Sequence, residues 1–525
     1  MDEITRVAVR LLERAQSGHA AESLAEAEEL LRARTGDLAD GPAALHMVRV
    51  LALNNLGGQH DSFPALDLVV AAAERDGSRG WLACGLATRA AQQLRLGETN
   101  STDYDLDGVL RDLVGAELLV GEETEPVAAV NGRVAIGIAY FELRLYELAG
   151  PQYEAAYAMS PADNGNRAMW LYNQAEMHLF WALELYQVGQ VTEAESHTAE
   201  AERYALAAAD AARGPQAAAW RDYALLAAAC AMADRHDPAG AAAAIDRALA
   251  AVSAHGMADS TIAFSRPFHA VALRRSGRPD EALAVIERAV AGLPADTGWL
   301  IAAATHRTKA VLLAARGSTD AEVGLAYGDN LAAALWRQRQ RTLQTVHTMK
   351  SLELLRARHE QATMAAEMDA LTGIANRGAF DRAVRRAQYR PDDFITVLVV
   401  DTDKFKQIND TDGHAAGDAA LRAIARALSA QVRDEDLLAR LGGDEFAVLL
   451  PGVDPVAGAL VAARMVDAVR AIPDCLATVS IGVAGAYAPD LPDTLDRADR
   501  AMYRAKRRGG DGVELSAVAA ATRAA

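Results

Sequence analysis

Residues 438–450 read LARLGGDEFAVLL, two short apolar runs joined by the turn Gly442-Gly443-Asp444-Glu445. Alternating apolar segments on either side of a Gly-Gly pair predict a β-hairpin, because glycine adopts positive φ angles without steric cost. The two acids then lie on a tight turn where the glycines present no side chain to a large ligand. The turn therefore suits a metal ion and a nucleotide.

A second set of acids follows the β-branched run ITVLVVD at residues 395–401. This run is predicted to be a buried strand that carries Asp401, Thr402 and Asp403 at its carboxyl end, where ligand sites gather in α/β sheets. If the strand neighbours the hairpin, carboxylates from both converge into the oxygen environment that Mg²⁺ prefers when it also holds phosphates. Either acidic pair alone is more typical of a solvated turn, but together they predict a site.

Polar side chains continue along KFKQINDTDGHAAGD at residues 404–418. Lys404 and Lys406 are point charges suited to phosphate, while Asn409 and Asp418 form a pair able to read the edge of a guanine base. Ordinary turn chemistry explains the Asn-Asp and Asp-Gly steps of this segment equally well.

The length of 525 residues predicts roughly two to four domains. The chain has 53 basic and 71 acidic residues and a net charge of −18. This balance argues against the broad basic surface of a protein that binds duplex nucleic acid. A nucleotide whose charge a metal carries remains compatible.

The three cysteines, Cys84, Cys230 and Cys475, are far apart and form no metal-ligand motif, which indicates reduced thiols. The first residues lack the basic start and apolar core of a signal peptide. No segment reaches the roughly 18 uncharged apolar residues that a membrane span needs. We therefore expect a soluble, cytoplasmic protein.

Residues 1–325 are rich in Ala and Leu at helical spacing, which predicts an all-α region of stacked helical hairpins. The predicted turns recur at intervals of about 40 residues, near Gly189, His236, Gly277 and Gly317. The pattern resembles a tetratricopeptide-repeat array, most closely at residues 277–291. Such repeats usually bind a protein or peptide partner in a concave groove, and a small-molecule ligand or self-association fits as well. A helical bundle without a groove is the alternative.

Residues 326–368 are predicted to form one connecting helix, since no Gly or Pro occurs between Gly328 and Gly373. One heptad frame contains Leu331, Leu335, Met349 and Leu352, but also Gln338, Thr342, Thr345 and Arg356. This pattern indicates a weak coiled coil at best. A dimerising helix and a solvated connector are both compatible with it.

After residue 370 the pattern changes to mixed strands and helices. The predicted elements are a strand at 395–401, a helix at 417–432, the hairpin, a helix at 455–471, a strand at 475–486 and a helix at 495–509. This order predicts an α/β domain of about 150 residues.

Residues 369–515 resemble the GGDEF family of diguanylate cyclases, which condense two GTP molecules into cyclic di-GMP. The matching stretches are DALTGIANR (369–377), VVDTDKFKQINDTDGHAAGDAAL (399–421), RDEDLLARLGGDEF (433–446), TVSIGVA (478–484) and ADRAMYRAK (498–506). The resemblance implies a nucleotide-cyclase-like fold, in which helices flank a mostly antiparallel sheet. Residues 516–525 are then a tail.

The resemblance also implies a role for each matching residue. It implies metal binding, by Mg²⁺ or Mn²⁺, at Asp401, the carbonyl of Thr402, Asp444 and Glu445; catalysis by Asp444 and Glu445; and substrate binding by Lys404, Phe405, Lys406, Asn409, Asp418, Gly442, Gly443 and Lys506. Asn409 and Asp418 hold the guanine, and the lysines contact phosphate. One departure is Gly510, which stands where the family commonly has an arginine; Arg507 or Arg508 are possible substitutes.

The implied reaction is attack of a ribose 3′-hydroxyl on the α-phosphorus of a second GTP, with Asp444 assisting deprotonation. Each domain holds one GTP, so a homodimer is implied. Arg433 and Asp436 match the family's RxxD site, at which cyclic di-GMP inhibits its own synthesis; a charged loop is the plain alternative. Two other readings stay open for the whole chain: a non-catalytic cyclic di-GMP effector and a protein-docking adaptor.

Overall fold

The computed structural model of the chain describes residues 3–16, 18–58, 61–100, 105–160, 167–213, 218–254, 259–294, 297–473 and 477–516. Cys475 and nearly all of the predicted tail lie outside these residues. The chain divides into two compact units, Met1–Leu352 and Glu353–Ala525.

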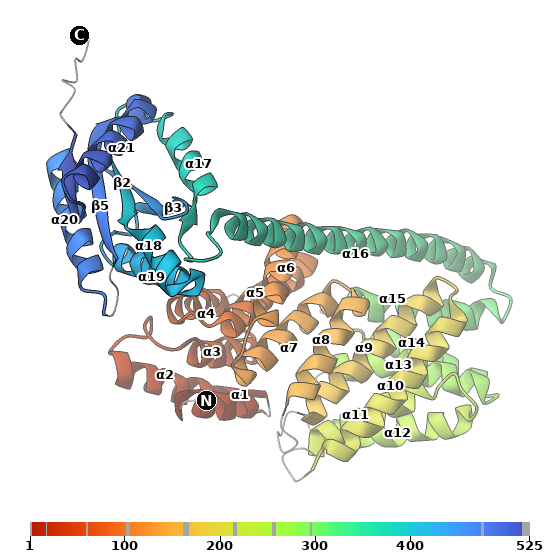
Figure 1. Cartoon of the computed structure of the whole chain (residues 1–525). Coiled ribbons are helices and arrows are strands. Elements are labelled where there is room, and N and C mark those ends of the chain that lie inside the picture. Colours follow the sequence, from red (N-terminus) through yellow and green to blue (C-terminus); the bar gives the residue numbers. More distant parts are fainter. Residues whose placement is uncertain are drawn as a thin grey trace. The chain divides into compact units, whose positions relative to one another are not determined.

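The N-terminal unit is built from helices, as the Ala- and Leu-rich periodicity predicts (Figure 1). They are α1 (Glu3–Gln16), α2 (Ala20–Thr35), α3 (Ala43–Asn55), α4 (Ser62–Asp76), α5 (Arg79–Asn100), α6 (Leu106–Gly121), α7 (Pro126–Glu142), α8 (Tyr146–Met159), α9 (Arg167–Gln187), α10 (Val191–Ala211), α11 (Ala218–Ala231), α12 (Pro238–Ala254), α13 (Asp259–Arg275), α14 (Pro279–Ala291), α15 (Trp299–Ala314) and the first part of α16 (Thr319–Glu367). Consecutive helices pack on each other, as α9 does on α10 and α13 on α14.

Each of the four predicted turns lies between two helices. Gly189, Gly277 and Gly317 adopt φ angles of 77°, 80° and 86°, which reverse the chain at little steric cost. The turn at His236 lies between α11 and α12.

Two hydrophobic cores fill the N-terminal unit. One is formed by α1 to α8 together with Met177 of α9 and Val346 of α16, and the rings of Tyr140 and Tyr146 are fully buried in it. The other is formed by α9 to α15 and includes Phe264 and Phe268. Most of the remaining core side chains are Ala, Val and Leu, and small side chains let neighbouring helices approach closely.

Helix α16 packs on the N-terminal unit through a face centred on Arg339 and Val346, both of which are buried. The Arg339 guanidinium pairs with Glu147 and donates to the backbone carbonyl of Arg144 at 2.6 Å. Its carbon also lies 4.5 Å from the ring centroid of Trp336, a cation–π contact. The buried residues Arg339 and Val346 each lie one position after a member of the predicted heptad frame. The middle of α16 therefore packs on the helices of the N-terminal unit.

The C-terminal unit contains a six-stranded sheet in the order β1-β3-β4-β2-β5-β6. Its elements are β1 (Ala375–Asn376), α17 (Arg377–Ala387), β2 (Phe394–Asp403), α18 (Phe405–Asp412), α19 (His414–Ser429), β3 (Leu437–Gly442), β4 (Glu445–Pro451), α20 (Pro455–Arg470), β5 (Thr478–Tyr487), a 3₁₀ turn (Ala488–Asp490), α21 (Leu491–Arg507) and β6 (Gly512–Leu515). The pairs β2–β4, β2–β5 and β3–β4 are antiparallel, whereas β1–β3 and β5–β6 are parallel.

Helices cover both faces of this sheet (Figure 1). Helices α19 and α20 pack on the face that carries Leu398 and Val400, while α17 and α21 pack on the face of Val397 and Val399. Because β2 is buried on both faces, its sequence reads as an unbroken apolar run. The predicted fold class, helices flanking a mostly antiparallel sheet, is confirmed.

Cys84 and Cys230 are buried free thiols, and burial raises the pKa of Cys84 to about 12. Across the described helices, none combines the length and the apolar character that a membrane crossing requires.

Candidate active site

Strands β2 and β4 are neighbours, so the two predicted acidic segments meet. Their antiparallel register places Asp401 opposite Glu445. The hairpin turns through Gly442 and Gly443, whose φ angles are 147° and 52°. A φ near 147° is accessible to glycine and strained for a residue with a side chain, which explains why the turn needs glycine at this position.

Two hydrogen bonds attach the hairpin turn to the end of β2. The backbone N–H and the side-chain hydroxyl of Thr402 both donate to the carbonyl oxygen of Asp444, each at 3.2 Å. The acidic turn is therefore held against the strand end instead of projecting freely into solvent. Asp444 is half-buried and Glu445 is exposed.

Asp401 is the buried member of the group, with 7% of its surface exposed. Burial raises the pKa of its carboxyl to about 6; the charges of Asp444 and Glu445 add to this, while Lys506 opposes it. Lys506, on α21, forms an ion pair with Oδ1 of Asp401. Three acids and one lysine from β2, the hairpin and α21 therefore interact electrostatically at this sheet edge.

Within the described residues, no three His, Cys, Asp or Glu side chains are arranged as a metal cluster. Asp401 alone nevertheless fits a cation, because its buried Oδ1 is in contact with the ammonium group of Lys506. The oxygen donors beside it are the carbonyl of Thr402 and the carboxylates of the hairpin. Such donors suit a hard cation that completes its shell with water and phosphate.

Lys404 connects β2 to α18 in a left-handed conformation, with φ of 58°. Lys404 and Lys406 are exposed at the start of this short helix, where the peptide dipoles also favour an anion. Phe405, between the two lysines, is half-buried and packs against the core under α19.

Asn409 and Asp418 come from two helices that pack together, α18 and α19. A methyl group at Gly417 would lie 2.1 Å from Oδ1 of Asn409, so only glycine leaves room for that side chain. Asp418 follows Gly417 directly and is exposed. The predicted guanine-binding pair is thus brought together at one helix junction.

Arg440 is a structural contributor to the turn that the sequence patterns did not identify. Its guanidinium donates to the carbonyl of Gly443 at 2.7 and 3.0 Å and to Asp369 at 3.1 and 3.3 Å. Burial raises the pKa of the Asp369 carboxyl, but hydrogen bonds from Thr372 and Arg440 lower it below the usual value overall. A charged residue inside the apolar run of β3 was the available signal.

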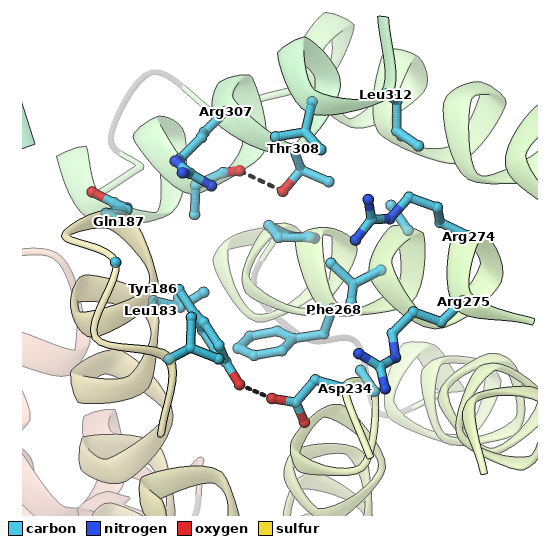
Figure 2. A pocket seen from close by; sticks show the side chains of 18 residues that line it. Leu183, Tyr186, Gln187, Asp234, Phe268, Arg274, Arg275, Arg307, Thr308 and Leu312 are labelled. Atoms are coloured by element: carbon cyan, nitrogen blue, oxygen red, sulfur yellow. Dashed lines mark hydrogen bonds between the residues drawn. The ribbon is translucent and has the colours of Figure 1, made fainter. Parts of the chain in front are cut away.

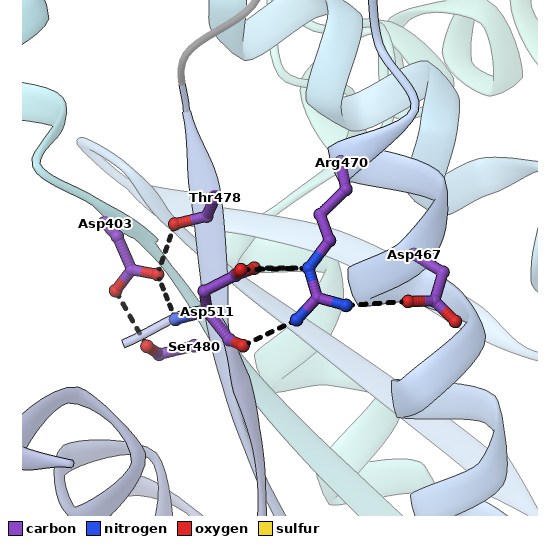
Figure 3. A network of polar contacts seen from close by, with 6 residues as sticks. All are labelled: Asp403, Asp467, Arg470, Thr478, Ser480 and Asp511. Atoms are coloured by element: carbon purple, nitrogen blue, oxygen red, sulfur yellow. Dashed lines mark hydrogen bonds and ion pairs between the residues drawn. The ribbon is translucent and has the colours of Figure 1, made fainter. Parts of the chain in front are cut away.

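Asp403 lies at the end of β2 but binds protein groups. Its carboxylate accepts hydrogen bonds from Thr478 at 2.9 Å, Ser480 at 2.7 Å and the backbone N–H of Asp511 at 2.8 Å. Figure 3 shows this network continuing from Asp511 to Arg470 of α20, with bonds of 2.9 Å. Asp403 therefore fixes the segment that follows α21.

Gly510 lies within the same network. Its φ angle is 78°, and a methyl group added there would lie 3.0 Å from the carboxylate of Asp403. A larger residue at this position would push on that buried acid. Of the two suggested substitutes for the missing arginine, Arg508 pairs with Glu514 at 2.6 Å, and Arg507 is exposed.

The RxxD segment forms a turn before β3. The backbone N–H of Arg433 donates to Oδ2 of Asp436 at 2.8 Å, and the N–H of Asp436 donates to the carbonyl of Arg433 at 3.1 Å. The guanidinium of Arg433 is exposed. This geometry fits a capped loop and leaves the arginine accessible.

A family model described as "Diguanylate cyclase, GGDEF domain" matches residues 366–512. Diguanylate cyclase TpbB of Pseudomonas aeruginosa is 41% identical over 167 residues, which cover 29% of this chain and 38% of the relative. The probable diguanylate cyclase DgcF of Escherichia coli K12 is 36% identical over 162 residues, 29% of this chain and 51% of the relative. The chain thus spans about half the length, or less, of these relatives.

A solved structure is also similar. The coiled coil and GGDEF domain of DgcB from Caulobacter crescentus, in complex with c-di-GMP, is 30% identical. The match covers 33% of this chain and 97% of that one, with a TM-score of 0.31.

Proposed function

We propose that this chain, whose residues 366–512 are a GGDEF domain, is a diguanylate cyclase that converts two GTP molecules into cyclic di-GMP and two pyrophosphates. The observation that carries the proposal is the attachment of the Asp444 turn to Thr402, which holds two acids beside the buried Asp401. A domain used only as a scaffold has no need for this arrangement. The similarity to diguanylate cyclases supports the same activity.

In this proposal Asp401, the carbonyl of Thr402 and the hairpin acids hold Mg²⁺ or Mn²⁺. The metal supplies charge neutralisation at the phosphoryl oxygens when it is bound. The ammonium of Lys506 now contacts Oδ1 of Asp401. If the Asp401 carboxylate held a metal, Lys506 would give up this contact and would be available to the triphosphate.

The remaining residues bind and orient GTP. Asn409 and Asp418 take the guanine edge, where the carboxylate accepts from the N–H groups of the base. Lys404 and Lys406 offer charge to the triphosphate at the N-terminus of α18, and Phe405 anchors that turn in the core. Gly442 and Gly443 leave space beside the phosphates.

The chemistry is phosphoryl transfer between two GTP molecules. The 3′-oxygen of one GTP forms a bond to the α-phosphorus of the other, and the bond to pyrophosphate breaks. The proton of the 3′-hydroxyl passes to a hairpin carboxylate, and we assign this role to Asp444 with Glu445 beside it. Ring closure is a second displacement of the same kind, in which the 3′-oxygen of the other GTP attacks the remaining α-phosphorus, the second pyrophosphate leaves and the proton passes to the hairpin carboxylate of the other domain. The two domains therefore face each other in a homodimer.

We further propose that Arg433 and Asp436 bind cyclic di-GMP and restrain synthesis, and that the N-terminal helices regulate the domain through a bound protein, peptide or small molecule. Added cyclic di-GMP should slow cyclic di-GMP synthesis by the wild-type protein more than synthesis by Arg433→Ala. Identical inhibition curves for the two proteins would remove the feedback proposal.

The proposal is tested by the double variant Asp444→Asn, Glu445→Gln, with Asp381→Asn on the exposed face of α17 as the matched control. We expect the control to form cyclic di-GMP at the wild-type rate and the double variant to lose at least about 100-fold. Both should keep the wild-type unfolding temperature. Full activity in the double variant would refute the site. Absence of synthesis by the wild type, with retained cyclic di-GMP binding, would instead favour an effector.

A further inference from the structure

A cavity of about 420 Å³ lies among α9, α13 and α15 of the N-terminal unit. Its volume falls in the range of pockets that hold small organic molecules. The turn between α9 and α10 and the segment after α11 close two of its sides. The proposed cyclase activity uses no residue of this cavity.

The walls of the cavity are largely apolar. Leu183, Phe268 and Leu312 contribute buried side chains from three different helices. In Figure 2, Phe268 points toward Tyr186 and Leu183 across the cavity. Walls of this kind favour an apolar body over a fully hydrated ligand, because burying apolar surface releases water.

Polar groups are few and mostly positive. Three arginines, Arg274, Arg275 and Arg307, line the cavity together with a single acid, Asp234. Figure 2 shows Arg274 and Arg275 on the side opposite Tyr186. The lining thus has an excess of positive charge beside an apolar floor.

The four charged groups are not equally engaged. Asp234 accepts a hydrogen bond from the hydroxyl of Tyr186; burial raises the pKa of its carboxyl, and nearby Arg275 opposes that shift. Arg307 is bound to Asp329 of α16 at 3.2 Å. The guanidinium of Arg274 has no hydrogen-bond or ion-pair partner in the part of the chain that the structure describes. Its charge is therefore available to a ligand.

We propose that this cavity binds a small organic acid, with an apolar body against Phe268 and a carboxylate bound by Arg274 and Arg275. A planar guanidinium binds a carboxylate through two parallel hydrogen bonds, which selects an acid over a neutral compound. A compact inorganic anion would satisfy the arginines but leave the apolar walls unused. A purely apolar compound would leave the charges beside it without a partner.

Arg307 links the cavity to α16, the helix that continues into the C-terminal unit. Arg307 lines the cavity, but its guanidinium is already paired with Asp329, which offsets its charge. Without that partner, Arg307 would add a further positive charge to the lining beside Arg274 and Arg275. The variant Asp329→Asn should therefore bind the acid severalfold more tightly, and an unchanged or weaker affinity would overturn this link.

Phenylbutyrate and phenylbutanamide are a matched pair of probes, because they differ in charge and hardly in shape. We expect calorimetric titration of the full chain to show that the acid binds and that the amide binds at least about tenfold more weakly. In Arg274→Gln the affinity for the acid should fall about tenfold and that for the amide should not change. Arg247→Gln, an exposed arginine on α12, is the control and should bind as the wild type does.

A third variant blocks the cavity itself. Thr308 lines it, and its hydroxyl donates to the carbonyl of Ala304 on its own helix at 2.7 Å, so Thr308→Phe fills space at small cost elsewhere. Neither probe should bind this variant, whose unfolding temperature checks its fold. Equal binding of acid and amide, no binding of the acid in the millimolar range, or undiminished binding by Thr308→Phe would each overturn the proposal. Binding of an acetylated alanyl-phenylalanine peptide acid without binding of phenylbutyrate would overturn the small-acid assignment.

Discussion

The guanidinium of Arg440 donates two hydrogen bonds to the carbonyl oxygen of Gly443, at 2.7 and 3.0 Å. Its remaining nitrogen bonds to Asp369, near the start of the C-terminal unit. The glycine turn is flexible by composition, and this arginine limits its movement from within the same hairpin. The position of Asp444 and Glu445 therefore depends on Arg440, which is not itself one of the acids of the site.

Replacing Arg440 tests this dependence. We expect Arg440→Gln to lower the rate of cyclic di-GMP synthesis by about tenfold or more, because a misplaced catalytic group costs rate steeply. Arg440→Lys should not restore it, since an ammonium lacks the planar fork. Arg464→Gln, exposed on α20, should leave the rate unchanged. Wild-type kinetics in Arg440→Gln would show that the turn holds its shape without this arginine.

The buried carboxylate of Asp401 should lower the free energy of unfolding although the proposed activity needs it. Burial raises the pKa of its carboxyl to about 6, so the folded state binds this proton more tightly than the unfolded chain. Its contribution to the free energy of unfolding is therefore present at low pH and lost as the pH rises through about 6.

Asp401→Asn removes the buried charge and should, without metal, stabilise the C-terminal unit by about 2 kcal/mol at pH 8 and by little at pH 4. The same variant should lose cyclase activity. Denaturant unfolding at the two pH values, beside an activity assay, measures both effects. A variant that is destabilised at pH 8 would contradict the assigned cause of the shift.

Replacing Gly510 by the arginine that is common in the family is expected to destabilise the C-terminal unit. Its φ of 78° and the contact with Asp403 both disfavour a side chain. Gly510→Ala should cost more than Gly452→Ala, a glycine with φ of 69° and open space around it. Backbone strain at positive φ should destabilise both variants by about 1 kcal/mol. In Gly510→Ala, steric contact with the Asp403 carboxylate should destabilise the fold by about a further 1 kcal/mol.

Unfolding free energies of the two alanine variants measure the difference. Equal decreases in the free energy of unfolding would mean that the Asp403 side chain moves aside at no cost. Because we expect it not to, Gly510→Arg should be no more active than the wild type.

Arg339 should hold α16 to the N-terminal unit. Removing it takes away one of the two arginines beside the buried Glu184, which keeps Arg144 and the hydroxyl of Tyr146, so we expect a cost of about 2 kcal/mol. We expect Arg339→Met to raise hydrogen exchange of amides near residues 335–350, while Arg341→Met on the exposed face of the helix does not. Unchanged hydrogen-exchange protection of these amides in Arg339→Met would show that the apolar contacts around Val346, and not Arg339, hold α16 on the N-terminal unit.

Much of this fold was predictable from local patterns. The Gly-Gly turn, the apolar run of β2 and the amphipathic α19 each contain their own signal, and the turns at Gly189, Gly277 and Gly317 need glycine for conformational reasons. These features depend on neighbours in sequence, which the chain itself displays.

Other features depend on partners distant in sequence. Asp403 and Asp401 look alike in the strand, yet one binds Ser480 and Asp511 and the other pairs with Lys506. The buried face of α16 likewise depends on Glu147, nearly 200 residues away. No local period distinguishes these cases, because the deciding contact is tertiary.

The central claim is that the full chain synthesises cyclic di-GMP. Its most direct test is incubation of the purified chain with GTP and Mg²⁺, with product identified by mass and pyrophosphate counted in parallel. We expect cyclic di-GMP, with two pyrophosphates released for each molecule of cyclic di-GMP formed. Purified, folded chain that binds GTP but releases neither product with Mg²⁺ or Mn²⁺ would contradict it.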